Sequence, residues 1–218
     1  MKQVNFLFII FYTFILMTIS CQSKAQTYTI ETNLGNIQVK LYDETPLHKE
    51  NFEKLVEAKF YNNVLFHRII QGFMIQTGNP GAKVFGEGET LEIDLNYTIP
   101  AEFVPEYFHK KGALAAARTG DAVNPEKRSS SSQFYIVQGR TYVDAELDQV
   151  EEHYQFKFSE FQRGIYKTTG GTPFLDQNYT VFGEVVKGLE VVEAIASVPT
   201  NQSGLPEQDI RIVRIVKD

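Results

Sequence analysis

The sequence predicts a mainly β protein built around a closed antiparallel barrel. Three features support this class: many short segments that alternate apolar and polar residues, two short amphipathic helical segments, and one charged, aromatic section that stands apart at residues 142–169. A closed barrel is the economical arrangement for many short strands, because closure leaves no strand edge exposed. The chain has 218 residues, of which 43 % are apolar, enough for the core of one domain.

A β-hairpin and a helix come first along the predicted domain. Residues 28–32 and 37–41 alternate apolar and polar side chains on either side of a short polar turn, which is typical of a hairpin. Thr45 and Pro46 then begin a helix, as a hydroxyl N-cap followed by a proline in the first turn. We expect this helix to end near residues 60–61.

Short β-rich runs and loops make up most of the rest of the chain. The expected strands are residues 64–70, 72–76 after a bend, 133–138, 180–185 and 210–216. Residues 77–111 are expected to be rich in loops, and residues 189–197 to form a short amphipathic helix. The segment Gly-Ala-Leu-Ala-Ala-Ala at 112–117 is compatible with a helix, by propensity, or with a strand crowded by a neighbour.

The section at 142–169 is expected to be a helical insertion that lies on the main body. Two helix starts are recognisable in it, at Asp144 and Ser159. Apolar residues about one turn apart give each helix a narrow apolar stripe: Leu147 and Val150 in the first, Phe161 and Ile165 in the second.

Residues 1–25 are predicted to be an export leader. Lys2 is the only charge before an apolar run at 6–19, which has the length of a signal-peptide core and is short for a membrane-spanning helix. Cleavage before Cys21 would match a bacterial lipoprotein with a lipidated cysteine, and cleavage after Ala25 would match the ordinary signal peptidase. We favour the lipoprotein, since a lone cysteine in an exported chain can form no internal disulfide. An uncut membrane anchor is the alternative.

Composition and missing motifs exclude several classes of function. The net charge of -6 and the pI of about 5.3 argue against a general nucleic-acid binder, which needs a basic face. The sequence contains no G-x-S-x-G and no H-E-x-x-H motif, and the spacing of its histidines does not suggest a metal site. We therefore expect no metal, no cofactor and no nucleic-acid partner.

Residues 66–76, Phe-His-Arg-Ile-Ile-Gln-Gly-Phe-Met-Ile-Gln, resemble the signature segment of the cyclophilins, which are peptidyl-prolyl isomerases. Further matches follow in the order and approximate spacing of the family: Ser132–Ile136, Phe174–Asp176 and Val181–Gly183. The resemblance covers roughly residues 27–218, apart from 142–169. It implies a closed eight-stranded antiparallel barrel capped by two helices, a monomer, and rotation of the peptide bond before proline.

The resemblance also implies a role for particular residues. Arg68 would hydrogen-bond the substrate around the prolyl amide, and Gln76 would steady that arginine and contact the substrate backbone. The positions that match substrate-binding residues of the family are Phe73, Met74, Ala117, Arg118, Gln133, Tyr135, Phe174, Leu175 and Tyr179. Rotation crosses a barrier of roughly 18–20 kcal/mol but breaks no bond, so the catalyst needs a dry groove and hydrogen-bond donors, and no nucleophile.

Four site positions depart from the best-known eukaryotic cyclophilins. Here Phe174 replaces a tryptophan, Tyr179 a histidine, Arg118 an asparagine and Tyr135 a phenylalanine. These changes bear on which peptides the pocket accepts more than on the reaction, because tyrosine still packs against a proline ring and donates a hydrogen bond.

Two functions remain open at this stage. The first is an enzyme that assists exported proteins as they fold, in the periplasm or as a membrane-anchored lipoprotein of a Gram-negative bacterium. Its partners would be proline-containing peptides and unfolded or folding exported proteins. The second is a binding module for proline-containing segments. The presence of both Arg68 and Gln76 favours the enzyme.

Overall fold

The computed structural model describes residues 26–86, 90 and 92–218. The predicted leader at 1–25, with both expected cleavage sites, lies outside the described residues. The helices are α1 (Pro46–Glu57), α2 (Asp144–Tyr154), α3 (Glu160–Thr168) and α4 (Leu189–Ala196), with single 3-10 turns η1 (Pro80–Ala82) and η2 (Pro173–Leu175). The strands are β1 (Thr27–Thr32), β2 (Gly35–Leu41), β3 (Val64–Leu65), β4 (Arg68–Ile70), β5 (Met74–Thr77), β6 (Thr98–Ile99), β7 (Ala113–Ala116), β8 (Ser129–Ser130), β9 (Phe134–Val137), β10 (Val181–Lys187) and β11 (Arg211–Lys217).

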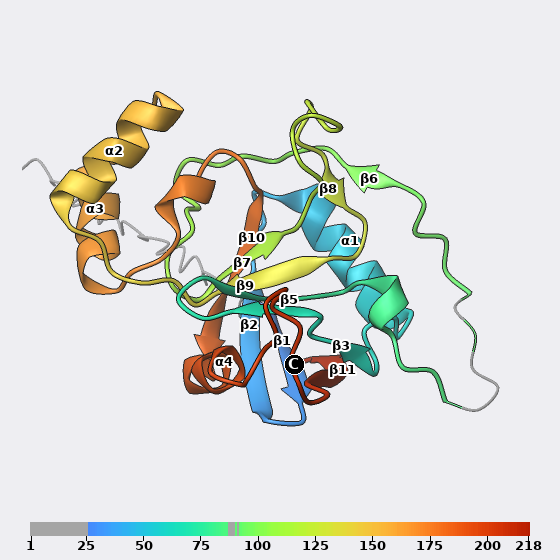
Figure 1. Ribbon diagram of the computed structural model, residues 1–218. Coiled ribbons are helices and arrows are strands. Elements are labelled where there is room, and N and C mark those ends of the chain that lie inside the picture. Colours follow the sequence, from blue (N-terminus) through green and yellow to red (C-terminus); the bar gives the residue numbers. More distant parts are fainter. Residues whose placement is uncertain (1–25, 87–89, 91) are drawn as a thin grey trace, which may run out of the picture.

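Nine strands of the described chain form one curled antiparallel sheet, in the order β3-β11-β1-β2-β10-β7-β9-β5-β4 (Figure 1). The expected closed eight-stranded barrel is therefore wrong, because this sheet has two edges, β3 and β4. The cause lies in residues 64–70, which were expected as one strand but break at Phe66 and His67. The two halves pair with different partners, β3 with β11 and β4 with β5. The break adds a strand to the count and leaves the hydrogen-bonded ladder open.

The alanine-rich segment at 112–117 is a strand, β7, and not a helix. It lies between β10 and β9, and all four of its residues are buried. The small side chains of Ala113, Ala115 and Ala116 allow other side chains to pack closely on both faces of the sheet. Tertiary packing thus overrides the helix propensity of alanine.

Helix α1 begins at Pro46 as expected, but it ends at Glu57, before residues 60–61. Lys59 has a positive φ of 55°, which does not continue a helix. The expected cap by the Thr45 hydroxyl is also wrong, since that side chain makes no capping bond. Instead the Glu102 carboxylate accepts hydrogen bonds of 3.0 Å from two backbone N–H groups of the first turn.

His48 ties this helix to the chain after β6 and to strand β8. Its Nδ1 lies 2.6 Å from the Glu102 carboxylate and its Nε2 lies 2.8 Å from the hydroxyl of Ser129. Burial lowers the pKa of His48 below its usual value of 6.5, against the opposing effect of Glu102. The ring is therefore neutral at pH 7, which fits a proton donated from Nδ1 and a bond accepted at Nε2.

The sheet buries both of its faces, and alternate residues of each strand belong to different cores. In β9, Phe134 and Ile136 belong to the inner core, and Tyr135 and Val137 to a second cluster on the outer face. Helices α1 and α4 pack their apolar residues into the inner core and lie at opposite ends of the curled sheet (Figure 1). The two capping helices expected from the sequence therefore match α1 and α4.

Helices α2 and α3 occupy the section at 142–169, which we call the helical segment. Their starts agree with the prediction, and Ser159 caps α3. The expected stripe of α2 is confirmed at Leu147, which is fully buried. The expected stripe of α3 is wrong at Phe161, which is 69 % exposed, and the fully buried residue of this helix is Tyr166.

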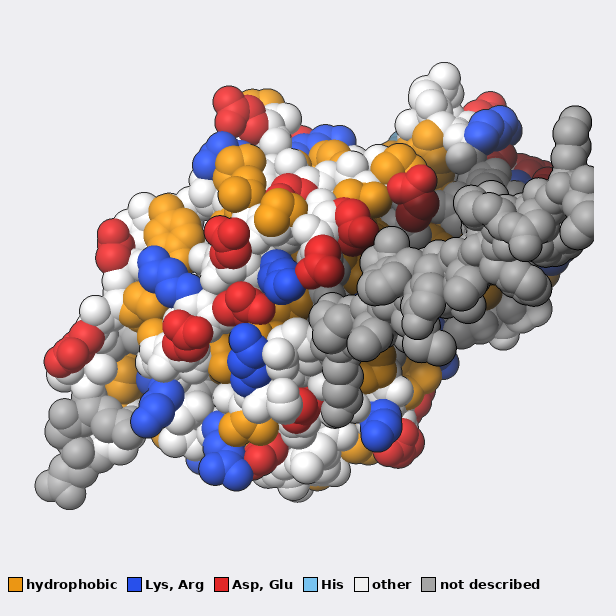
Figure 2. Space-filling model, turned by 180° about the vertical axis from the view of Figure 1, so that it is seen from behind, with side chains coloured by type: hydrophobic (Ala, Val, Ile, Leu, Met, Phe, Trp, Pro, Cys, Tyr) orange, Lys and Arg blue, Asp and Glu red, His pale blue; other side chains and the backbone are white. Residues whose placement is uncertain are grey.

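The surface carries mixed charges on the face drawn in Figure 2. Acidic and basic side chains are interspersed there, with no single basic patch. Across the described residues, no helix combines the length and the apolar character that crossing a bilayer requires.

Candidate active site

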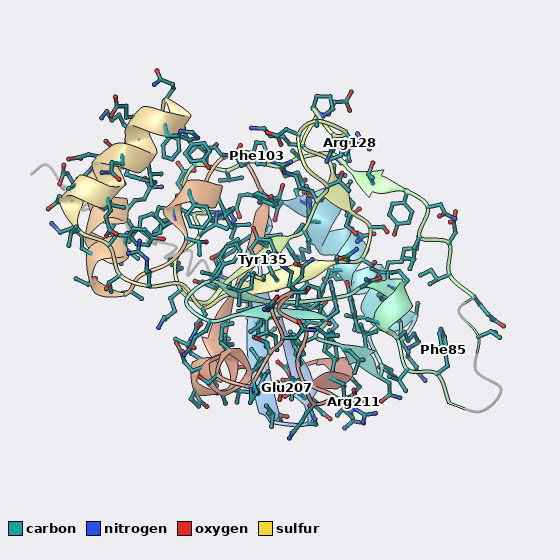
Figure 3. All side chains as sticks on the ribbon, in the orientation of Figure 1. Phe85, Phe103, Arg128, Tyr135, Glu207 and Arg211 are labelled. Carbon is teal, nitrogen blue, oxygen red and sulfur yellow. The ribbon has the colours of Figure 1, made fainter. Side chains whose placement is uncertain are left out.

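Three neighbouring strands place a row of side chains on the outer face of the sheet. Arg68 on β4 is directly opposite Gln76 on β5, and Gln76 is directly opposite Tyr135 on β9. Residues directly opposite each other in an antiparallel pair point to the same face. The row therefore runs across the sheet from Arg68, which is exposed at the edge, to Tyr135, which is buried in the body of the sheet and is labelled in Figure 3.

A pocket of about 90 Å³ opens on this row. Its lining consists of predicted site residues: Arg68, Phe73, Met74, Gln76, Ala117, Arg118, Tyr135, Leu175 and Tyr179. The two remaining predicted residues lie beside it. Gln133 accepts a hydrogen bond of 3.2 Å from Gln76, and the rings of Phe174 and Phe73 have centres 5.6 Å apart. The structure thus brings together residues from four separate stretches of the chain.

The floor of the pocket is apolar and buried. Met74, Tyr135 and Leu175 are at most 9 % exposed, and together they present a thioether, an aromatic ring and a branched aliphatic chain. Side chains of this kind give a proline ring large contact area with little polarity. A small apolar ring can therefore displace water from the pocket at little cost.

The rim of the pocket is polar and includes the exposed side chain of Arg68. Its Nη1 lies 3.5 Å from the Gln76 side-chain oxygen, a long hydrogen bond, and its Cζ lies 5.9 Å from the centre of the Phe73 ring. Gln76 thus restrains the arginine only loosely. The exposed guanidinium retains donors that can turn toward a ligand above the pocket.

Arg118 forms a fixed wall on the other side of the pocket. Its Cζ lies 4.4 Å from the centre of the Tyr179 ring, while Nε donates to the carbonyl of Asn178 at 2.7 Å and Nη1 to Asp121 at 2.6 Å. Only 4 % of this side chain is exposed. The residue that replaces the family's asparagine is therefore held by its own neighbours.

A buried chain of hydrogen bonds supports the pocket from below. The Asp176 carboxylate accepts bonds from the backbone N–H of His109 at 2.8 Å and from the Tyr166 hydroxyl at 2.6 Å. His109 Nδ1 also lies 2.8 Å from Asp176, and its Nε2 lies 3.0 Å from the Tyr135 hydroxyl. All four side chains are at most 4 % exposed. This chain joins the helical segment, through Tyr166 on α3, to the floor of the pocket.

The protonation of this chain follows from its contacts. Burial, followed by the nearby Tyr179 and Asp176, raises the pKa of Tyr135 well above 10, so its hydroxyl keeps its proton. With Nδ1–H donated to the carboxylate, Nε2 of His109 accepts a hydrogen bond from the Tyr135 hydroxyl. The orientation of the floor tyrosine is therefore set by a directional bond as well as by packing.

Sequence reasoning did not assign roles to His109, Asp176 or Tyr166. The sequence contained part of the information needed to find Asp176, because this residue belongs to the Phe-Leu-Asp match. In addition, Tyr135, which replaces a phenylalanine, needs a hydrogen-bond partner for its hydroxyl when it is buried. His109 and Tyr166 carried no local pattern that pointed to this role.

The part of the chain that the structure describes contains no group of three or more histidine, cysteine, aspartate or glutamate side chains that could hold a metal ion. The site instead combines an apolar pocket with an arginine and two glutamines at its rim. Such an arrangement can bind a small apolar ring and hydrogen-bond a nearby amide.

A family model described as cyclophilin type peptidyl-prolyl cis-trans isomerase/CLD matches residues 27–217. The chain belongs to the cyclophilin family. The assignment suggested by residues 66–76 is thus confirmed at the level of the family, and the curled antiparallel sheet is its cyclophilin fold.

Relatives and solved structures agree with this assignment. The chain is 32 % identical over 206 residues to a peptidyl-prolyl cis-trans isomerase of Acinetobacter baylyi, covering 91 % of this chain and 89 % of the relative. It is 36 % identical over 184 residues to a Staphylococcus saprophyticus protein provisionally named as such an isomerase, covering 84 % of this chain and 87 % of that protein. A crystal structure of a Cryptosporidium parvum cyclophilin matches with a TM-score of 0.64 and 25 % identity, over 88 % of this chain and 97 % of that one. This cyclophilin is a peptidyl-prolyl cis-trans isomerase.

Proposed function

We propose that this cyclophilin accelerates the folding of exported proteins by rotating Xaa-Pro bonds over the pocket, with Arg68 as the group that favours the twisted amide. One observation carries the proposal. An exposed guanidinium lies at the rim of a pocket with an apolar floor, next to side-chain amides that can hold a peptide backbone.

Rotation is catalysed when the enzyme binds the twisted amide more tightly than either planar form. The proline ring would rest on Met74, Tyr135 and Leu175, which fix it while the preceding carbonyl turns. Twisting ends the resonance of the amide and returns electron density to its nitrogen. A cationic donor from Arg68 at that nitrogen stabilises the twisted form, and each 1.4 kcal/mol of this preference gives about tenfold in rate.

The peptide backbone would be held on the side of Ala117 and Arg118. Within the chain, the Ala117 N–H donates to the Gln133 carbonyl at 2.9 Å and the Ala117 carbonyl accepts from Ser130 at 2.8 Å. This pairing leaves Arg118 as the better placed of the two for backbone contact with a substrate. Gln76 and Gln133 add side-chain amides on the same rim.

Several observations support the proposed setting and partners. The apolar run and the small residues before Cys21 and Ala25 suit an exported protein or a lipoprotein in the periplasm of a Gram-negative bacterium. Membrane attachment would occur only through a lipid on Cys21, which mass spectrometry of the mature N-terminus would detect. The protein would act as a monomer on proline-containing peptides and unfolded chains, without nucleic acid. A Cryptosporidium parvum cyclophilin has been crystallised in the presence of the dipeptide Ala-Pro, which supports a proline-containing substrate.

A refolding assay tests the proposal. The substrate is a protein with a slow refolding phase limited by proline isomerisation, and this cyclophilin is added in substoichiometric amounts. We expect the slow phase to accelerate in proportion to enzyme and the fast phase to stay unchanged. A variant of the substrate protein without the slow phase serves as the control. An unchanged or retarded slow phase would contradict a folding enzyme and favour the binding module.

A further inference from the structure

A second hollow, of about 420 Å³, adjoins the proline pocket on the side of the helical segment. Phe73 lines both the pocket and this hollow. Phe174, whose ring centre is 5.6 Å from that of Phe73, stands beside it in the same wall. The two cavities therefore lie next to each other and share the Phe73 side chain.

The proline pocket lies between two larger cavities. On its other side, Gln76, Ala117 and Arg118 line both the pocket and a third hollow of about 340 Å³. Shared lining residues place the three cavities next to one another, with the proline pocket in the middle. An extended peptide whose proline fills the pocket must leave it in two directions, and one of these leads across Phe73.

Helix α2 forms the far wall of the second hollow. The residues it contributes are spaced i, i+3, i+4, i+7 and i+8, which is one complete face of a helix: Glu146, Gln149, Val150, His153 and Tyr154. This face can line the hollow because residues on the neighbouring faces of α2 pack against other parts of the molecule. Leu147 is buried in the core of the helical segment.

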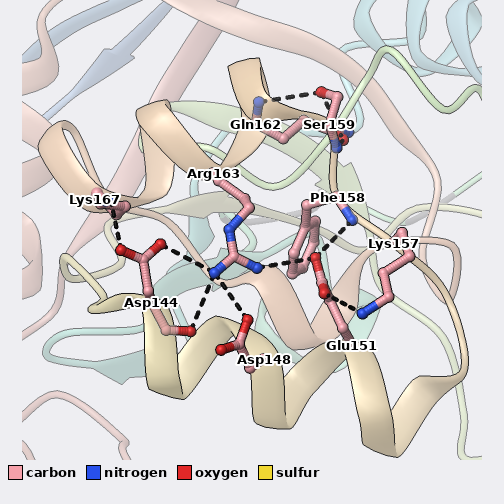
Figure 4. Close-up of polar contacts among 9 residues, drawn as sticks. All are labelled: Asp144, Asp148, Glu151, Lys157, Phe158, Ser159, Gln162, Arg163 and Lys167. Carbon is pink, nitrogen blue, oxygen red and sulfur yellow. Dashed lines mark hydrogen bonds and ion pairs between the residues drawn. The ribbon is translucent and has the colours of Figure 1, made fainter.

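Helix α2 is held in place by α3, so the wall of the hollow is preformed. Arg163 on α3 donates to Asp144 at 3.0 Å and to Glu151 at 3.1 Å, and it pairs with Asp148 at 2.9 Å (Figure 4). Lys167 adds a bond to Asp144 at 2.7 Å. The contacts of Arg163 join three successive turns of α2 to one side chain of α3. They therefore fix the orientation of the α2 face that lines the hollow.

The lining suits an aromatic side chain. Tyr142, Tyr154 and the two phenylalanines of the shared wall contribute rings, and Val150 contributes an aliphatic chain. The guanidinium of Arg140 already has partners within the lining. Its Cζ lies 4.0 Å from the centre of the Tyr142 ring, and it pairs with Glu146 at 2.8 Å. The hollow therefore offers stacking surfaces and apolar contact with its charges paired internally.

We propose that this hollow binds an aromatic side chain of the substrate peptide, within about three residues of the proline, on the side of the pocket away from Arg118. Three extended residues span about 10 Å, a reach suited to a neighbouring cavity. The inference rests on the proposed function and deepens it. It makes the helical segment a specificity element for peptides that carry an aromatic residue near proline.

Rates on matched peptides test the inference. A short Xaa-Pro peptide is compared with two extended peptides that carry phenylalanine two or three residues before or after the proline, and with serine versions of each. We expect kcat/KM for one phenylalanine peptide to exceed that of its serine version by about tenfold, from burial of one ring. Gln149→Trp, which fills the hollow, should reduce this ratio to about one. Glu152→Trp, on α2 but outside the hollow, should retain it.

Fluorescence supplies a second, direct readout, because the chain contains no tryptophan. Tyr154→Trp places one at the hollow, where Tyr154 is 39 % exposed. Its emission should shift when the preferred phenylalanine peptide binds but not when the short peptide binds, and a tryptophan at Glu152 should respond to neither. Equal phenylalanine and serine rates, or a silent Tyr154→Trp at saturating peptide, would overturn the inference. If the short peptide itself is not isomerised, the proposed function fails instead.

Discussion

Arg68→Ala is expected to slow catalysed cis–trans interconversion of a short Xaa-Pro peptide by about a hundredfold to a thousandfold. Removing one preorganised donor from a site of developing charge has this effect in other enzymes, corresponding to about 3–4 kcal/mol. The loss should fall on kcat more than on KM, because Arg68 acts on the twisted amide and the apolar floor still binds proline. Exchange spectroscopy on the peptide measures the rate at substoichiometric enzyme.

Two further variants control for the loss of charge. Arg214→Ala removes an exposed arginine that pairs with Glu31 on the β1–β11 ladder, far along the sheet from the site, and it should keep the full rate. Arg68→Lys keeps the charge but not the planar fork of donors, so it should recover only part of the rate. If Arg68→Ala is as fast as the wild type, the role assigned to this arginine is wrong.

Asp176→Ala is expected to lower the free energy of unfolding by about 3–5 kcal/mol, because each buried donor that loses its acceptor costs about 1–3 kcal/mol. The carboxylate satisfies the backbone N–H and the ring of His109 and the hydroxyl of Tyr166, all in the interior. Alanine would leave these donors without acceptors. Urea unfolding at pH 7 measures the change, which is a large part of the stability of an ordinary domain.

The control for Asp176 is an exposed carboxylate in an ion pair. Glu31→Ala breaks the bond to Arg214 at the surface, where solvent replaces the lost partner, so its effect should be small. Any Asp176→Ala protein that remains folded should also show a raised KM, because the Tyr135 hydroxyl loses its fixed partner. Equal stabilities of Asp176→Ala and Glu31→Ala would contradict a structural role for the buried chain.

The local elements of the fold could largely be predicted from the sequence. Alternation over residues 28–41 indicates the β1–β2 hairpin because turn and strands are neighbours in the chain. The break of the strand at Phe66 and His67 could not be predicted in this way. It depends on β3 and β4 pairing with β11 and β5, and β11 lies at the opposite end of the sequence.

The same distinction between contacts that are local in the sequence and contacts between distant segments applies to the candidate site. Arg68 and Gln76 are eight residues apart and directly opposite on paired strands, so one motif contains both. The bond between His109 and Asp176 joins residues 67 positions apart, and the contact of Asp176 with Tyr166 depends on how α3 is rotated. The orientation of α3 also explains why Phe161 is exposed. The buried hydrogen bond of Tyr166 fixes how the helix is rotated, and this overrides the apolar stripe predicted from the spacing of Phe161 and Ile165.

Backbone chemical shifts of this cyclophilin, recorded while a short Xaa-Pro peptide is added, test most directly whether the outer-face pocket is where the prolyl bond is held. We expect the largest changes on the amides of Phe73, Gln76, Arg118 and Tyr135, and no change for the inner-core residues Ile30 and Val192. Saturation with the largest changes elsewhere, and with Gln76 and Tyr135 unmoved, would contradict it.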